Sequence, residues 1–271
     1  MRLCLMIEGQ EDVTWDQWVA LARACEESGI ETLFRSDHYL SVEGAGGRGS
    51  LDAWATINAL AALTSRLRLG TLVSPATFRH PSTLAKMVVT ADHVSGGRIE
   101  LGMGAGWLEA EHRAYGFPFA DTRTRMDVLA EQLEIVHRSW KPGPFSFHGE
   151  HYTLEDLDAL PKPVQQPHPP LLVGGSGGPR SLALAARWAD EYNMPFASAE
   201  RCREVRSALD EACGKEAREP LPLSVMTRLQ GTQETAETLH ELAQAGVERV
   251  MLQHLEHANI EAVREVGRLR R

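Results

Sequence analysis

An acidic residue and a histidine stand side by side in the stretch "ETLFRSDHYL", at Asp37 and His38. They follow the apolar run 32–36, which is typical of a buried strand, and precede the glycine-rich segment 39–50. A histidine exchanges protons near neutral pH and a carboxylate accepts hydrogen bonds, so the pair suits proton transfer. A helix cap or an internal hydrogen bond would also explain the pair, and its place in the fold decides between these interpretations.

A second stretch, "LLVGGSGGPRS", combines glycines with a polar residue ahead of a helix. It contains Gly175, Ser176, Gly177 and Gly178, and then Pro179, which suits the first turn of a helix. Free N–H groups at such a helix start can bind a phosphate, and a tight turn between strand and helix is the alternative interpretation.

A third stretch, "IELGMGAGWLEAEH", places Gly102, Gly104 and Gly106 at alternate positions. Alternate residues of a strand share a face, so this face leaves room for a flat ligand or for a neighbouring backbone. Trp107 follows at once and is expected to form a pocket wall.

Composition and motifs argue against several classes of function. The formal charge of −9 without a basic block argues against nucleic acid as a partner. No apolar stretch approaches the roughly 20 residues of a membrane span, and the start lacks a secretion signal, so we expect a cytoplasmic protein without a membrane partner. The four scattered cysteines and the lack of an HExxH motif predict reduced thiols and no metal. "GGSGG" is not the GxSxG elbow of a Ser/His/Asp hydrolase.

The elements that must position these residues are short apolar runs alternating with helical patterns. The predicted strands cover 2–8, 32–36, 67–74, 99–104, 170–175, 191–196, 221–228 and 249–255. The first predicted helix begins after Thr14 and ends near Gly29, and the others cover 52–63, 81–94, 122–139, 179–188, 199–213, 233–245 and 257–269. Eight strand–helix units close most simply as an α/β TIM (β/α)8 barrel, and an open doubly wound sheet is the alternative.

Chain length and loop lengths predict one barrel domain over residues 1–271 with one insertion. The connection 39–50 is long enough to act as a lid. The connection at about 141–169 is expected to form a small hairpin and then a proline-rich extended stretch. Because TIM-barrel active sites form at the C-terminal ends of the strands, Asp37 and His38 should lie at the barrel mouth, which favours their functional interpretation.

Taken together, these motifs resemble the luciferase-like monooxygenase superfamily, and within it the coenzyme F420 (deazaflavin)-dependent oxidoreductases. The resemblance rests on "MIEGQE", "SDHY", "TFRHP", "SGGR", the pattern GxGxGWxExExxAYG, "PKPVQ" and "VGGSGGPRS" in this order. It spans residues 6 to about 193, and the last quarter of the chain matches only in its barrel pattern.

The resemblance implies a deazaflavin at the barrel mouth, where a hydride passes between ring carbon C5 and the substrate. It implies a non-proline cis peptide at the end of the third strand, which by position is Leu72–Val73. The implied cofactor-binding residues are Asp37, Leu72, Val73, Ser74, Thr77, Gly104 and Gly106, with the phosphate on Gly175, Ser176, Gly177 and Gly178.

The resemblance also implies roles at the reacting centre. His38 becomes the proton donor or acceptor, and Asp37 a hydrogen-bonding group for the cofactor. In the sugar-phosphate dehydrogenase branch a glutamate directly follows the strand glycines, whereas here Trp107 does, which argues against a sugar phosphate and leaves Glu109 as an alternative catalytic acid. The expected substrate pocket comprises Glu8, Tyr39, Trp107, Asn193 and Met194.

Two alternatives to the F420 interpretation stay open. The flavin ring of FMN has nearly the same shape, so an FMN-dependent monooxygenase using a separate reductase and O2 is the first. A non-catalytic deazaflavin-binding protein is the second. The apolar, aromatic pocket favours a small organic substrate with a C=C, C=N or C=O bond, with reduction as the leading direction. Dimers are common in the family, so a homodimer is compatible with the resemblance.

Overall fold

A closed barrel of parallel strands forms the centre of the computed structural model, which describes residues 1–42 and 46–269. The barrel strands are β1 (Arg2–Ile7), β2 (Thr32–Arg35), β3 (Arg68–Thr71), β5 (Ile99–Gly104), β8 (Leu171–Gly174), β9 (Glu191–Pro195), β10 (Leu223–Arg228) and β11 (Arg249–Gln253). They pair in the order β3-β2-β1-β11-β10-β9-β8-β5, and β5 pairs with β3 to close the ring. This closure confirms the predicted TIM barrel and excludes the open sheet.

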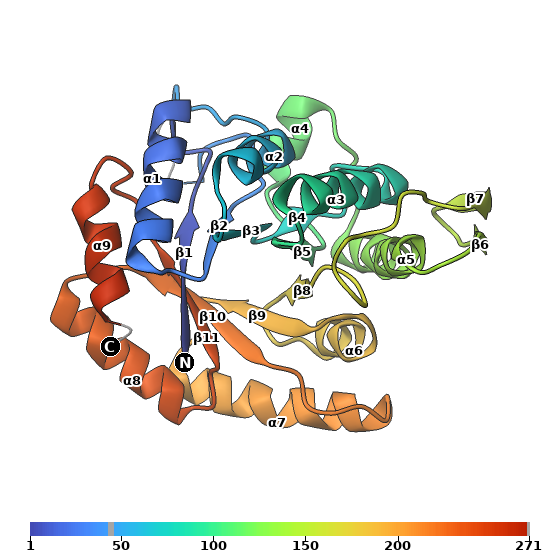
Figure 1. The fold of residues 1–271 in the computed structure, drawn as a ribbon. Coiled ribbons are helices and arrows are strands. Elements are labelled where there is room, and N and C mark those ends of the chain that lie inside the picture. The colour runs from blue at the N-terminus through green and yellow to red at the C-terminus, as the bar shows by residue number, and fades with distance from the viewer. Residues whose placement is uncertain (43–45, 270–271) are drawn as a thin grey trace.

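A ring of helices surrounds the strands (Figure 1). These helices are α1 (Trp15–Ser28), α2 (Ala53–Leu63), α3 (Pro81–Ser95), α5 (Thr122–Trp140), α6 (Pro179–Trp188), α7 (Ala199–Lys215), α8 (Thr232–Gln244) and α9 (Ile260–Arg268). The short helix α4 (Glu109–Tyr115), between β5 and α5, was not predicted. Within the described ranges, none of the helices combines the length and the apolar character that a membrane crossing requires.

Local sequence signals set the helix ends, as α1 illustrates. The Thr14 hydroxyl accepts the Gln17 N–H at 3.3 Å, and the Gln17 side chain accepts the Thr14 N–H at 2.9 Å, which together form a capping box. Gly29 ends the helix in the left-handed conformation with φ 72°. Both predicted ends of this helix are therefore confirmed.

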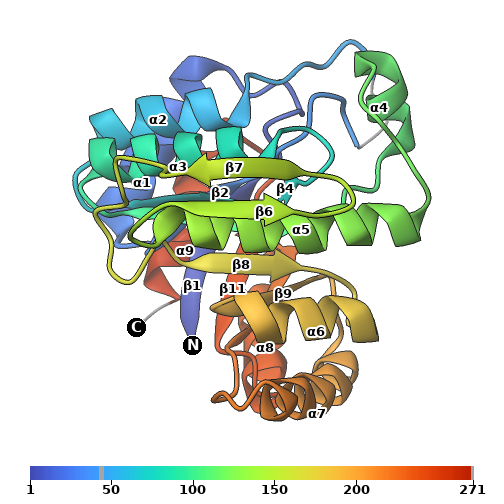
Figure 2. The same ribbon diagram turned by 90° about the vertical axis from the view of Figure 1, so that its right-hand side faces the viewer.

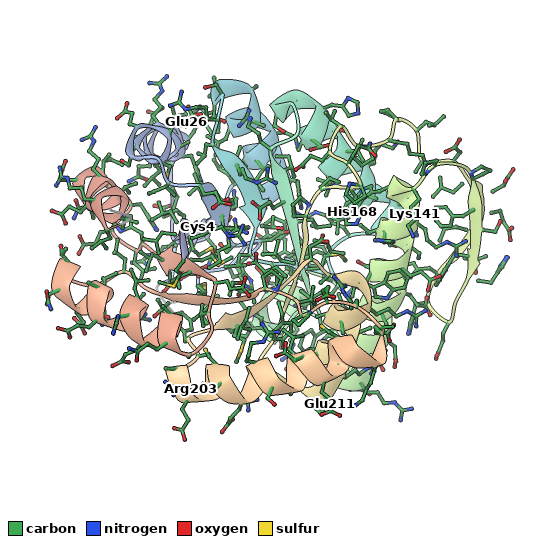
Figure 3. All side chains as sticks on the ribbon, turned by 60° about the horizontal axis from the view of Figure 1, so that its bottom comes forward. Cys4, Glu26, Lys141, His168, Arg203 and Glu211 are labelled. Carbon is green, nitrogen blue, oxygen red and sulfur yellow. The ribbon has the colours of Figure 1, made fainter. Side chains whose placement is uncertain are left out.

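Strand side chains alternate between the barrel interior and the helix layer. Leu5 packs outward into the large core beneath the helices, whereas its neighbours Cys4 and Met6 point inward. The interior cluster consists of Cys4, Met6, Phe34, Leu72, Leu172, Met226 and Met251, with Val73 packed on it. Figure 3 shows Cys4 inside the molecule, with Arg203 and Glu211 at the outer surface of α7.

A buried ion network closes the barrel at the N-terminal ends of the strands. Arg249 Nη1 lies 2.7 Å from Glu100 Oε2 and 3.2 Å from Glu191 Oε2, and its Nη2 donates to the Thr32 hydroxyl at 2.7 Å. These residues stand at or next to the first position of their strands. The network therefore lies at the end of the barrel opposite to the mouth.

The third barrel strand differs from its expected form. The sequence predicts one strand over 67–74, but β3 ends at Thr71 and a two-residue strand, β4 (Ser74–Pro75), resumes the pairing with β5. The Leu72–Val73 peptide between them is cis, as the resemblance implies. The break turns the chain out of the β3 ladder before it reaches the mouth.

The insertion and the loop after β2 are the two long connections. Strands β6 (Phe145–His148) and β7 (Thr153–Leu157) form the expected antiparallel hairpin, which lies outside the helix ring over α3 and α5 (Figure 2). The middle of the segment expected to be a lid, residues 43–45, lies outside the described residues. In the described parts of this segment, Glu11 accepts hydrogen bonds from Ser41 and the Val42 backbone and pairs with Arg48 at 2.7 Å.

Candidate active site

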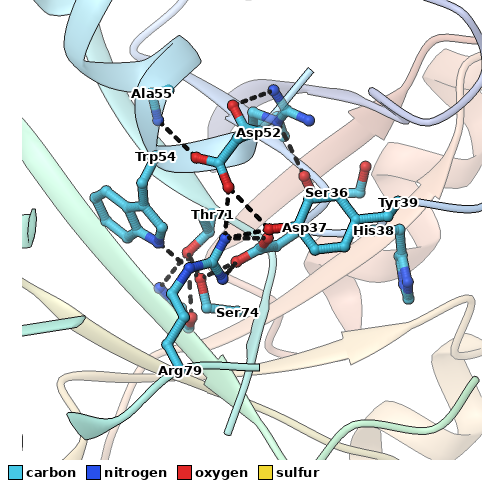
Figure 4. A network of polar contacts seen from close by, with 12 residues as sticks. Ser36, Asp37, His38, Tyr39, Asp52, Trp54, Ala55, Thr71, Ser74 and Arg79 are labelled. Atoms are coloured by element: carbon cyan, nitrogen blue, oxygen red, sulfur yellow. Dashed lines mark hydrogen bonds and ion pairs between the residues drawn. The ribbon is translucent and has the colours of Figure 1, made fainter. Parts of the chain in front are cut away.

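Asp37 is the centre of a polar network at the barrel mouth (Figure 4). Arg79 donates from Nη1 to Asp37 Oδ2 at 2.6 Å and from Nη2 to Oδ1 at 3.1 Å, and the Ser74 hydroxyl donates to Oδ2 at 2.7 Å. Asp37 is 1% exposed and Ser74 is fully buried. Protein donors therefore engage both oxygens of the carboxylate, which fixes the backbone that leads from β2 to His38.

The same network extends to the start of α2. Asp52 caps this helix by accepting the Ala55 N–H at 2.9 Å, and its other oxygen accepts from Arg79 at 3.0 Å and from the Tyr39 hydroxyl at 2.9 Å. The Tyr39 ring stacks on Phe78 with centroids 5.4 Å apart. Tyr39 is thus held by this network and by an aromatic stack at the rim of the mouth.

His38, next to Asp37 in the chain, contacts α4. Its Nδ1 lies 2.9 Å from Glu111 Oε2, and its ring meets the edge of Trp107 at 5.6 Å between centroids. The other nitrogen, Nε2, has no protein partner among the described residues. Figure 4 shows the His38 ring pointing away from the Asp37–Arg79 pair. His38 therefore offers one free nitrogen from a side chain that is only 13% exposed.

Three carboxylates influence the proton affinity of His38. Burial on its own lowers the pKa of His38, but the hydrogen bond and charge of Glu111, with the charges of Glu8 and Asp37, raise it above the ordinary 6.5. Burial on its own raises the pKa of Glu111. The hydrogen bond and charge of His38, together with the hydrogen bonds from the backbone N–H groups of Tyr39 and Leu40, outweigh burial, so the pKa of Glu111 is lowered. The arrangement favours an imidazolium next to an ionised carboxylate.

Glu8 is the second acid at the mouth, directly after β1. Gln253 Nε2 donates to one of its oxygens at 2.7 Å and Gln10 Nε2 to the other at 2.8 Å. Glu8 is 5% exposed, so both amides orient a carboxylate that is largely shielded from water. Sequence reasoning found Glu8 but missed the two glutamines, because amide side chains at strand ends are not distinctive in sequence.

Val73 provides the apolar floor of the mouth. Its side chain is half-buried and packs on the interior cluster. A Cβ atom at Gly102 would lie 2.8 Å from Val73 Cγ1, one at Gly104 would lie 2.8 Å from Cγ2, and one at Gly174 would lie 3.1 Å from Cγ1. Protein atoms thus fill the room that the strand glycines leave, and the neighbouring-backbone interpretation is correct at Gly102, where the Cβ would also meet the Thr71 carbonyl oxygen at 2.3 Å.

The glycine-rich turn adjoins this floor and opens α6. The N-cap of α6 is Gly178, and among the described residues no side chain caps the helix. The Gly177 N–H is taken by the Tyr192 hydroxyl at 2.9 Å, whereas Ser176 is exposed. Pro179 has no N–H, so the first-turn N–H groups that no described side chain caps, and that could face an anion, are those of Arg180 and Ser181.

Several predicted residues lie away from the mouth or serve other contacts. Met194 packs into the core beneath the helices, because strand alternation places it opposite to Asn193, which donates to the Ser224 hydroxyl at 3.0 Å inside the barrel. Thr77 binds His112 of α4 at 2.6 Å, and a Cβ at Gly106 would lie 2.7 Å from the Thr77 hydroxyl.

Glu109, expected as an alternative acid, projects from the first turn of α4 into solvent and lies 3.8 Å from Arg113. Glu111 contacts His38 in its place. Glu109 and Glu111 are two residues apart on a helix, so their side chains face different directions and only Glu111 faces His38. No local pattern marks Glu111, because the buried positions of α4 are Glu111 and His112, whereas the apolar residues Ala110, Ala114 and Tyr115 are exposed.

Comparison with known proteins shows the family of the chain. The family model described as luciferase-like monooxygenase matches residues 4–270. An uncharacterized protein of Mycobacterium tuberculosis is 39% identical over 143 residues, which cover 53% of this chain and 49% of that protein. The match therefore spans about half the length of this relative.

Two relatives with named activities differ in cofactor. An F420-dependent hydroxymycolic acid dehydrogenase of Mycobacterium tuberculosis is 29% identical over 83% of this chain and 61% of its own. An FMNH2-dependent dimethylsulfone monooxygenase of Pseudomonas putida is 29% identical over 73% of this chain and 52% of its own.

Solved structures share the architecture. An F420-dependent secondary alcohol dehydrogenase, in complex with an F420-acetone adduct, matches with a TM-score of 0.86 and 16% identity over 100% of both chains. At this identity the likeness shows the fold. Because the family model covers nearly the whole sequence and the barrel has the same architecture, the protein belongs to the luciferase-like monooxygenase family.

Proposed function

We propose that the protein is an F420-dependent oxidoreductase that reduces a C=C, C=N or C=O bond of a small organic substrate. The observation that carries the proposal is His38, whose free Nε2 stands at the barrel mouth beside an apolar floor. The F420-dependent relative, 29% identical over 83% of the chain, is compatible with this cofactor, and the FMNH2-dependent relative is equally identical over 73%.

The described residues suit a deazaflavin. The half-buried Val73 offers an apolar surface for a flat ring, and the α6 start, without a side-chain cap, offers N–H groups to a phosphate. Ser176, Gly178 and the first turn of α6 would hold the phosphate, and Val73 would support the ring. The bound deazaflavin supplies or accepts a hydride at its C5 atom.

The residues of the chain would supply the proton and the environment. In the reducing direction, His38 gives the proton on Nε2 to the substrate atom that does not receive the hydride, so that the C=X bond becomes H–C–X–H. Trp107, exposed by 63% and in edge contact with His38, would form a wall against the substrate. Asp37 would act indirectly, since Arg79 and Ser74 occupy its oxygens.

An FMN-dependent monooxygenase is the second candidate, favoured by the dimethylsulfone monooxygenase relative. Titration of the purified protein with oxidised F420 and separately with FMN, followed by cofactor fluorescence quenching, distinguishes the two. We expect micromolar binding of F420 and much weaker binding of FMN. The reverse preference would assign oxygen chemistry with a separate reductase, and F420 binding without turnover of any unsaturated substrate would favour a binding protein.

A further inference from the structure

A fully buried carboxylate next to His38 has no part in the function proposed above. Glu111 places Oε2 at 2.9 Å from His38 Nδ1, while its Oε1 accepts the backbone N–H groups of Tyr39 and Leu40, the latter at 3.0 Å. A buried carboxylate is stable only where donors satisfy it. Here three donors converge on it, and all three belong to the segment that carries the reactive histidine.

This contact determines which nitrogen of His38 carries the hydrogen. An ionised carboxylate can only accept hydrogen bonds, so Nδ1 must donate to Glu111. Neutral His38 is then the Nδ1–H tautomer with a bare Nε2, and protonated His38 carries its transferable proton on Nε2. Nε2 is the nitrogen without a protein partner among the described residues, so the pairing presents the proton toward the mouth.

The charged groups that face His38 are acidic. They are Glu111 from α4, Glu8 after β1 and Asp37 from the same segment, and the Trp107 ring covers one edge. Arg79, the cation of the adjoining network, is bound to Asp37 through both Nη atoms. Glu111 is the acid in direct contact with the imidazole, and it therefore has the largest influence on its proton.

We propose that Glu111 is a positioning residue that fixes His38 in the Nδ1–H tautomer. The inference rests on the proposed function in so far as His38 exchanges a proton with a substrate. It assigns to α4 the task of holding the proton-transfer group, in place of the catalytic acid expected at Glu109.

If Glu111 only anchored the loop, Glu111→Gln would leave the tautomer and the pKa of His38 unchanged. The glutamine oxygen can still accept the N–H groups of Tyr39 and Leu40, so the anchor remains. Its NH2 group then faces Nδ1 of His38, which must become an acceptor, and the hydrogen moves to Nε2. The substitution thus keeps the shape and reverses the tautomer.

The test is nitrogen-15 NMR of histidine-labelled full-length protein across a pH series, with the His38 signals identified by their loss in His38→Gln. We expect wild type to show the Nδ1–H tautomer when neutral. Glu111→Gln should show the Nε2–H tautomer and a lower pKa of His38. The matched control is Glu109→Gln, on the same helix but exposed, which should change neither quantity.

Two results would overturn the proposal: an Nε2–H tautomer in wild type, or an unchanged tautomer and pKa in Glu111→Gln. The wild-type spectrum alone is decisive if Glu111→Gln fails to fold. The NMR measurement needs no cofactor, so it tests the contact between Glu111 and His38 even if the protein does not bind F420. The cofactor titration tests the proposed function separately. In a protein that turns over, Glu111→Gln should move the pH profile of kcat to lower pH.

Discussion

Single residues at the mouth divide into those engaged by the protein and those open to a ligand. Asp37 has its oxygens bound by Arg79 and Ser74, whereas no described residue forms a hydrogen bond with Nε2 of His38. Replacing His38 with Ala should lower kcat by about 10²–10⁴-fold, the usual contribution of a positioned acid or base, with little change in the Kd of the cofactor. Steady-state kinetics and fluorescence titration measure the two effects, and unchanged turnover would remove the assignment.

The raised pKa of His38 predicts the pH dependence of the reaction. Reduction needs the imidazolium as proton donor, so kcat should be highest at low pH and fall as pH rises through a pKa above the ordinary 6.5. The reverse oxidation needs the neutral imidazole and should rise over the same range. A pH–rate series in both directions checks this, and profiles with the same slope in both directions would contradict it.

At the scale of elements, β5 packs closely against the end of β3 and the residues that follow it. A Cβ at Gly102 would lie 2.3 Å from the Thr71 carbonyl oxygen, a backbone atom that cannot rotate away. Gly102→Ala should therefore lower the free energy of unfolding by about 1–3 kcal/mol and disturb Val73 above it. Urea denaturation measures the loss.

The matched control for this prediction is Gly214→Ala in α7. Beyond its neighbours in the helix, no described residue lies within 4 Å of a Cβ at this position, and alanine has the higher helix propensity. The control should stabilise the protein by up to about 1 kcal/mol. Equal effects of the two substitutions would show that β5 accommodates a side chain after all.

At the scale of the whole molecule, charged side chains are buried inside the barrel. Arg249 is buried with Glu100 and Glu191 at the end opposite the mouth. Arg249→Met should lower the free energy of unfolding by about 3–5 kcal/mol, because buried carboxylates lose their partner. Denaturant unfolding monitored by circular dichroism measures it. Arg264→Met, which removes an exposed pair with Glu261, should cost less than about 1 kcal/mol, and an equal loss would contradict the account.

The sequence by itself determined the order of the eight barrel strands and of the helices that surround them, the barrel, and the position of His38 after the second strand. Apolar runs of period two and helical patterns with caps are local signals. The caps that the sequence predicts at Thr14 and Gly29 are the ends of α1 in the structure. The family motifs also led to the Leu72–Val73 peptide. The prediction that Asn193 and Met194 both line the pocket was wrong. Neighbouring residues of a strand point to opposite faces, so the sequence of 191–195 already showed that only one of the two side chains can point into the barrel.

Only the tertiary structure decided which side chains meet at the mouth. Glu111 reaches His38 across 73 positions of the chain, and Arg79 reaches Asp37 across 42. Which of Glu109 and Glu111 faces His38 depends on the orientation in which α4 packs against the barrel. Val73 fills the space beside glycines of two other strands. Contacts of this kind depend on barrel closure, which brings distant strand ends together, and no local pattern of residues encodes the partner across such a gap.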